Sequence, residues 1–109
     1  MYLIICKYLT PKGYTGIALF PFIIIRNEIE STNLVLINHE KIHLRQQIEL
    51  LILPFYILYF IDFLIKIIRF KNKEIAYRNI VFEKEAYTNE NNFDYLKSRS
   101  FWNWLTYMK

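Results

Sequence analysis

Residues 33–53 of this chain read NLVLINHEKIHLRQQIELLIL, and this stretch decides the predicted fold. Its apolar side chains recur at helical spacing, at Leu36, Leu44, Ile48 and Leu51. The spacing predicts a helix from about Leu34 to about Leu53. The residues before it are candidate N-caps, namely Ser31, Thr32 and Asn33. Pro54 follows, and proline ends or kinks a helix because it has no backbone N–H.

The same helix carries the motif H-E-x-x-H, at His39, Glu40 and His43. Residues four apart share one face of a helix, with Cβ atoms about 5–6 Å apart. Two imidazoles placed in this way can bind one zinc ion, while Glu40 lies off the ligand axis, within reach of a water molecule. The alternatives are a chance match on a polar helix face and two structural histidines. Because these are the only two histidines of the chain, the spacing favours a metal site.

A catalytic zinc ion usually has three protein ligands and one open position. The chain has no third histidine, so we expect a carboxylate as the third ligand. Glu49 lies six residues after His43 on the same helix and cannot reach an ion bound by the two histidines. Asp62 lies within an apolar run, where its carboxylate is equally well explained as a buried structural group. The best place is the segment FEKEAY, residues 82–87, which offers Glu83 and Glu85. These two point about 200° apart on a regular helix, so only one of them can bind the ion.

With these residues in place, the chain resembles the gluzincin class of HExxH zinc metallopeptidases, and in its length the minigluzincins. The segment HEKIHLRQQ, residues 39–47, also resembles small Bacteroidetes metallopeptidases. The resemblance implies that His39, His43 and Glu83 bind Zn²⁺ and that Glu40 is the general base and later the acid. Glu83 fits the helical pattern E-x-x-A-D up to Ala86, but Tyr87 replaces the aspartate. We therefore expect the carboxylate that orients a ligand histidine to be missing.

The resemblance further implies that the strand before the motif helix, Ile17 to Ile25, binds a peptide substrate along an exposed edge. The alternative is that this isoleucine-rich strand belongs to the core. Three tyrosines are candidates for stabilising an oxyanion, namely Tyr77, Tyr87 and Tyr95. Gln47 lies on the ligand face, where it lines the site or is simply solvated.

The rest of the chain predicts a single minimal metallopeptidase-like domain, residues 1–109, of α+β class and mostly α. Short strands come first, at Tyr2–Leu9 and Ile17–Ile25, and Pro21 marks the second as an edge strand. Three further segments are expected to be helical: a long apolar helix over 55–69, a glutamate-bearing helix over 74–89, and an aromatic tail over 93–107 that packs back as a short helix or two.

Composition excludes several functions. Two glycines exclude a phosphate-binding or dinucleotide-binding loop, and one cysteine, Cys6, excludes a disulfide scaffold. A net charge of +4 is spread along the chain, so we expect no nucleic-acid binding. The lone cysteine and the absence of a signal peptide pattern predict a cytoplasmic protein.

The apolar stretch Leu50 to Ile68 allows a second interpretation of where the protein acts. It is interrupted by Asp62 and followed by a basic cluster, which fits either a buried helix or contact with a membrane surface. The main hypothesis is a zinc peptidase acting on peptides or proteins. The alternatives are a membrane-associated interaction protein with a structural or vestigial zinc site, and a latent enzyme completed by a partner or by a second copy.

Overall fold

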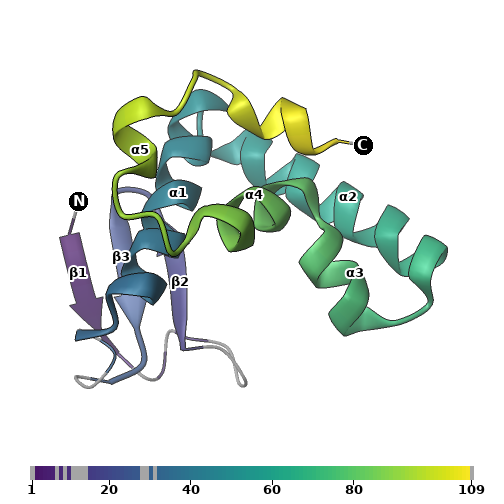
Figure 1. Ribbon diagram of the computed structural model, residues 1–109. Helices are drawn as coiled ribbons and strands as arrows, with labels where there is room; N and C mark the ends of the chain where they lie inside the picture. Colours follow the sequence, from purple (N-terminus) through teal and green to yellow (C-terminus); the bar gives the residue numbers. More distant parts are fainter. Residues whose placement is uncertain are drawn as a thin grey trace.

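The computed structural model describes residues 2–6, 8, 10, 15–27, 30 and 32–108 (Figure 1). Its elements in chain order are β1 (Tyr2–Ile5), β2 (Gly16–Leu19), β3 (Phe22–Ile25), α1 (Leu34–Glu49), α2 (Leu53–Phe70), α3 (Lys73–Asn79), α4 (Val81–Asn89), α5 (Tyr95–Ser98) and the 3₁₀ helix η2 (Asn103–Tyr107). A small N-terminal sheet followed by helices confirms the predicted α+β class.

The sheet corrects the predicted second strand. Instead of one strand over 17–25, the chain turns at Phe20 and Pro21 and forms the antiparallel pair β2 and β3. Proline cannot donate to a central ladder, so it takes the turn. The strand order is β1-β3-β2, with β1 parallel to β3. Within the predicted range only β2 is an edge strand, because β3 lies between β1 and β2 and buries Ile23 and Ile25 completely. The first strand ends at Ile5 rather than Leu9.

Helix α1 begins where predicted and ends earlier. Asn33 caps it, because its side-chain oxygen accepts the Leu36 N–H at 3.1 Å, whereas Ser31 lies outside the described residues. The helix stops at Glu49 because Leu51 turns left-handed and Ile52 N–H bonds back to the Gln47 carbonyl. Pro54 does not end α1. It lies in the first turn of α2, where its missing N–H costs nothing.

The buried residues of α1 are not those of the predicted apolar stripe. Leu44 is buried, but Ile48 and Leu51 are exposed. The helix instead buries polar side chains, namely Asn38, His39, Glu40, His43, Gln46, Gln47 and Glu49. Buried polar groups require hydrogen-bond partners, and neighbouring elements supply them. The Asn38 amide, for example, donates to the carbonyls of Glu90 and Asn92 beyond the end of α4.

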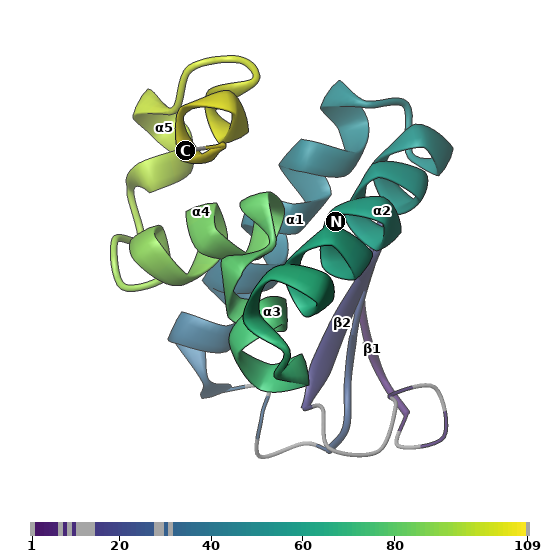
Figure 2. The ribbon, with the colours of Figure 1, turned by 90° about the vertical axis from the view of Figure 1, so that its right-hand side faces the viewer.

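The predicted helix over 74–89 is two helices, because Ile80 is extended and separates α3 from α4 (Figure 2). Ile80 is buried in the core with Phe55, Phe82 and Trp104. Asp62 of α2 stabilises the break, since its carboxylate accepts the Val81 N–H at the start of α4 at 2.7 Å. Asp62 is thus a structural group and not a ligand.

The tail packs back as predicted, through α5 and η2. Its anchor is Arg99, whose buried guanidinium bonds to Glu49 of α1 and Glu85 of α4. Among the residues that the structure describes, no single helix is long and apolar enough to cross a membrane; α1 and α2 meet that length and composition only as a pair bent by 113°.

Candidate metal centre

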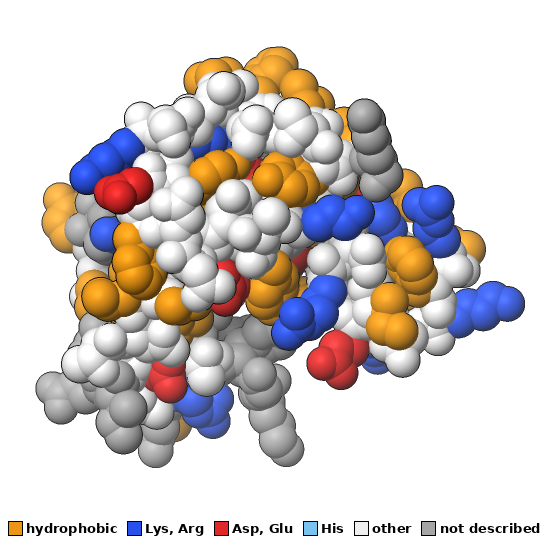
Figure 3. Space-filling view, in the orientation of Figure 1, with side chains coloured by type: hydrophobic (Ala, Val, Ile, Leu, Met, Phe, Trp, Pro, Cys, Tyr) orange, Lys and Arg blue, Asp and Glu red, His pale blue; other side chains and the backbone are white. Residues whose placement is uncertain are grey.

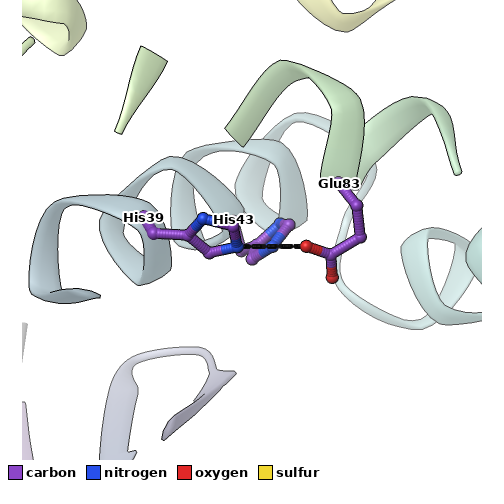
Figure 4. Close-up of side chains that lie close together, drawn as sticks. All are labelled: His39, His43 and Glu83. Carbon is purple, nitrogen blue, oxygen red and sulfur yellow. Dashed lines mark hydrogen bonds and ion pairs between the residues drawn. The ribbon is translucent and has the colours of Figure 1, made fainter. Parts of the chain in front are cut away.

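Three buried side chains converge between α1 and α4 (Figure 4). Glu83 Oε1 lies 3.0 Å from His39 Nε2 and 3.1 Å from His43 Nε2, and the two nitrogens are 3.2 Å apart. Ligands at about 2.0–2.1 Å around a tetrahedral ion are separated by about 3.3–3.4 Å. The three atoms therefore form nearly one face of a coordination tetrahedron, and they fit a metal ion with one open position.

The other nitrogen of each ring is held by a hydrogen bond. His39 Nδ1 lies 2.9 Å from Glu90 Oε1, and His43 Nδ1 lies 2.8 Å from Gln46 Oε1. Both partners accept, so each Nδ1 donates and each Nε2 lone pair is left for a metal. The expectation that the orienting carboxylate is missing is therefore wrong: Glu90, three residues after Tyr87, takes that place.

Glu83 is held from its far side. Tyr59 of α2 donates its hydroxyl to Glu83 Oε2, which leaves Oε1 directed at the histidines. Sequence reasoning missed Tyr59, although its position four residues after the buried Phe55 marks it as part of the inner face of α2. Burial, reinforced by the Glu83 charge, raises the pKa of Tyr59, so the hydroxyl remains a donor.

The metal-free cluster is an ion pair. Burial disfavours a charged His43, but the adjacent Glu83 carboxylate outweighs burial and raises the His43 pKa to about 9. Burial likewise opposes ionisation of Glu83, yet the charge of His43 and hydrogen bonds from both rings hold its pKa far below the usual range. A metal ion would replace this proton with a larger positive charge.

Glu85 belongs to a different network. Its carboxylate accepts from Arg99, from Tyr95 at 2.6 Å and from Gln46 at 2.8 Å. Burial opposes ionisation of Glu85, but these donors outweigh it and lower its pKa. Glu83 therefore lies with the histidines and Glu85 does not. The link through Gln46 nevertheless connects Glu85 to His43.

Glu40 lies between two cavities that open beside the cluster. One, of about 650 Å³, is lined by His39 and by charged side chains of both signs, among them Lys73, Glu74 and Arg78. The other, of about 340 Å³, extends past His43 and is mostly apolar, with Phe55 among its walls. The two share four lining residues, which are Gly16, Glu40, Phe63 and Tyr77. They therefore form one cleft, with charged groups in the larger part and mostly apolar walls in the smaller one.

Burial raises the pKa of Glu40, against the opposing charges of His43 and His39. Strand β2 lies directly beside it. A Cβ atom placed on Gly16 would meet Glu40 Oε2 at 3.4 Å, so glycine leaves the carboxylate open to the cleft.

The three candidate tyrosines lie in different surroundings. Tyr77 lines both cavities. Tyr87 lines only the larger one, where its ring makes a T-shaped contact with His39 and the Arg78 guanidinium lies over its face. Tyr95 bonds to Glu85 and is not part of the cleft lining. Gln47 does not line the cleft either, because its buried amide binds β2 through the Ala18 carbonyl and the Phe20 N–H.

The chain matches no protein-family model, no curated protein and no solved structure, so the case for its function rests on this geometry.

Proposed function

We propose that this protein is a zinc-dependent hydrolase of peptide bonds. The observation that carries the proposal is the triangle of His39, His43 and Glu83, which faces a cleft lined by Glu40. Two histidines and a glutamate form one of the donor sets of catalytic zinc. When bound, zinc supplies Lewis acidity, which polarises a carbonyl group and lowers the pKa of water.

Glu40 is the general base in this proposal. Its carboxylate takes a proton from the attacking water and then gives it to the nitrogen of the leaving amine. Burial raises the pKa of Glu40, which favours its keeping the proton between the two steps. Of the three candidate tyrosines, Tyr77 lines both cavities, and we propose it as the one that borders the developing oxyanion.

The edge of β2 supports a peptide as substrate. In the antiparallel ladder of β2 and β3, hydrogen-bonded residue pairs alternate with pairs that are not hydrogen-bonded. Thr15 and Arg26 form a hydrogen-bonded pair, because the Arg26 N–H donates to the Thr15 carbonyl. By alternation, the backbone groups of Gly16 and Ala18 face away from β3. The Ala18 carbonyl already accepts from Gln47 and Tyr56. The Gly16 amide and carbonyl are therefore the groups proposed to pair with an extended peptide.

A purely structural zinc site fits less well. Structural sites are closed by four protein ligands. Within the part of the chain that the structure describes, three ligand residues converge, and the cluster borders a cleft rather than being sealed. An open fourth position favours catalysis.

The test is zinc content and hydrolysis of a quenched-fluorescent peptide library by the purified full chain. Glu40→Gln should retain zinc and lose at least about a hundredfold in kcat/KM. His39→Ala should lose both zinc and activity. Glu74→Gln, which changes another carboxylate of the same cleft, is the matched control and should keep both. The proposal fails if the wild type does not bind zinc, or if Glu40→Gln remains fully active.

A further inference from the structure

Helix α2 is apolar on both of its faces. Its inner face packs against the rest of the molecule through Phe55, Tyr59 and Phe63. Its outer face exposes eight large apolar side chains, which are Leu53, Ile57, Leu58, Phe60, Ile61, Leu64, Ile65 and Ile68. At 100° per residue, these eight occupy a continuous arc of about 160° without one charged residue.

An apolar outer face is not expected on a helix that faces only water. A helix that covers a soluble core carries polar residues on its far side, and contiguous exposed apolar patches of this kind mark an interaction surface. Ile68 is 76% exposed and Leu53 is 67% exposed, and the two lie near opposite ends of the helix. The patch therefore runs the full length of α2, about 27 Å.

Cations border the patch at one end. Arg69, Lys71 and Lys73 are all exposed where α2 meets α3, and Lys and Arg side chains gather there in Figure 3. The one acidic residue of α2, Asp62, is already bonded to Lys66 and to the Val81 N–H. A second copy of α2 would offer the apolar patch a partner, but α2 has no exposed carboxylate to match the three cations. The exposed Glu74 of α3 beside them still leaves an excess of positive charge.

We propose that the outer face of α2 docks in the plane of a membrane surface that contains anionic phospholipids. The apolar arc enters the boundary between headgroups and acyl chains, and the three cations bind lipid phosphates. The inner face remains packed on α4, so the helix lies on the bilayer and does not cross it. The cleft is lined by the inner face of the same helix, about one helix diameter from the lipid.

Vesicle flotation of the full chain tests this surface. Protein purified in mild detergent is mixed with phosphatidylcholine vesicles, with or without roughly 30% phosphatidylglycerol, and the detergent is removed. We expect the wild type to float with the anionic vesicles. The double variant Ile61→Glu, Leu64→Glu should bind at least about tenfold more weakly. Leu34→Glu, an equally drastic change at an exposed leucine of α1, should bind like the wild type.

A second pair of variants leaves the apolar arc intact. Arg69→Gln with Lys71→Gln should weaken binding to anionic vesicles only, and 0.5 M salt should do the same to the wild type, on the order of tenfold. Circular dichroism and zinc content confirm that each variant is folded. The proposal is overturned if the wild type floats with neither kind of vesicle, or if the glutamate pair binds unchanged. It is also overturned if the wild type is a lipid-free dimer that the glutamate pair dissociates.

Discussion

At the scale of single residues, the metal centre depends on which nitrogen of each histidine is left free. The Nδ1 atom of His43 is hydrogen-bonded to Gln46, and that of His39 is hydrogen-bonded to Glu90. Tyr59 donates a hydrogen bond to one carboxylate oxygen of Glu83. Three ligand atoms are thereby aimed at a single point. Such outer partners fix the ring tautomer and reduce the reorganisation that metal binding requires.

Gln46→Leu should therefore weaken zinc binding about 10- to 100-fold, because His43 loses its Nδ1 acceptor. The measurement is competition with a chromophoric chelator. Gln47→Leu is the matched control: it alters the next residue, equally buried, but one that binds β2 instead of a ligand. Equal losses of affinity in the two variants would contradict the role assigned to Gln46.

The pH dependence of stability should reverse when zinc is bound. In the metal-free protein, the His43 pKa rises from 6.5 to about 9, so its contribution is full below pH 6.5 and is lost as the pH rises through 9. Such a shift corresponds to about 3 kcal/mol. The lowered pKa of Glu83 stabilises the fold above pH 4.5 and fails in stronger acid. Metal-free stability should therefore be greatest between about pH 4.5 and 6.5.

Zinc requires a deprotonated His43, so its stabilising effect should grow as the pH rises towards 9. Urea unfolding at pH 5.5, 7.0 and 8.5, with chelator or with zinc, measures both trends. His43→Gln should remove the alkaline decline of the metal-free protein. A decline that persists in this variant would refute the assignment to His43.

At the scale of elements, the break at Ile80 positions Glu83 in the first turn of a separate helix. A continuous helix over 74–89 would have fixed the direction of α4 by that of α3. The extended Ile80 frees α4 to pack along α1, and Asp62 satisfies the N–H that the break exposes.

Asp62→Ala should lower the free energy of unfolding by about 1–2 kcal/mol, because α4 loses its cap and Lys66 loses its partner. Urea denaturation measures this loss. Asp94→Ala removes an exposed pair with Lys97 and should change stability by less than about 0.5 kcal/mol. Similar effects of the two substitutions would mean that Asp62 does not cap α4.

At the scale of the whole molecule, Arg99 ties the C-terminal tail to the two helices that carry the metal centre. Its guanidinium bonds to Glu49 and Glu85, 50 and 14 residues away in the chain. The pair Ile80 and Trp104 packs in the neighbouring apolar core. The C-terminal tail is therefore an integral part of the folded domain.

Arg99→Met should destabilise the protein by about 3–5 kcal/mol, because it leaves two buried carboxylates without their cation. Thermal and urea unfolding measure the effect. The double variant Arg99→Met, Glu85→Gln should regain part of the stability, because it removes one of the two unpaired buried charges. Lys97→Met, at an exposed position nearby, serves as the control and should be nearly neutral.

The sequence by itself determined the motif helix and the face that it presents. The 3.6-residue period places His39 and His43 on one side wherever that helix packs, and the scarcity of other ligands requires a carboxylate. The apolar run after Pro54 placed α2, and the aromatic residues of the tail predicted that it packs back. The apolar pattern of 17–25 did not reveal the hairpin at Pro21, because the same isoleucine-rich run fits one strand or two. Helical periodicity did not reveal the break at Ile80, because the break depends on Asp62, 19 residues before Val81.

Only the tertiary structure decided which carboxylate joins the histidines. Glu83 and Glu85 are two positions apart, and helix periodicity does not choose between them; only the resemblance of the E-x-x-A pattern favoured Glu83. Their surroundings separate them, since Tyr59 holds Glu83 against the histidines while Arg99 and Tyr95 hold Glu85 away. Several of these contacts join residues that are far apart in the chain. Tyr59 lies 24 residues from Glu83, Glu90 lies 51 residues from His39, and Arg99 lies 50 residues from Glu49. Contacts between such distant residues exist only once the helices pack, which is why the spacing of residues gave the two histidines but not Tyr59, Glu90 or Arg99.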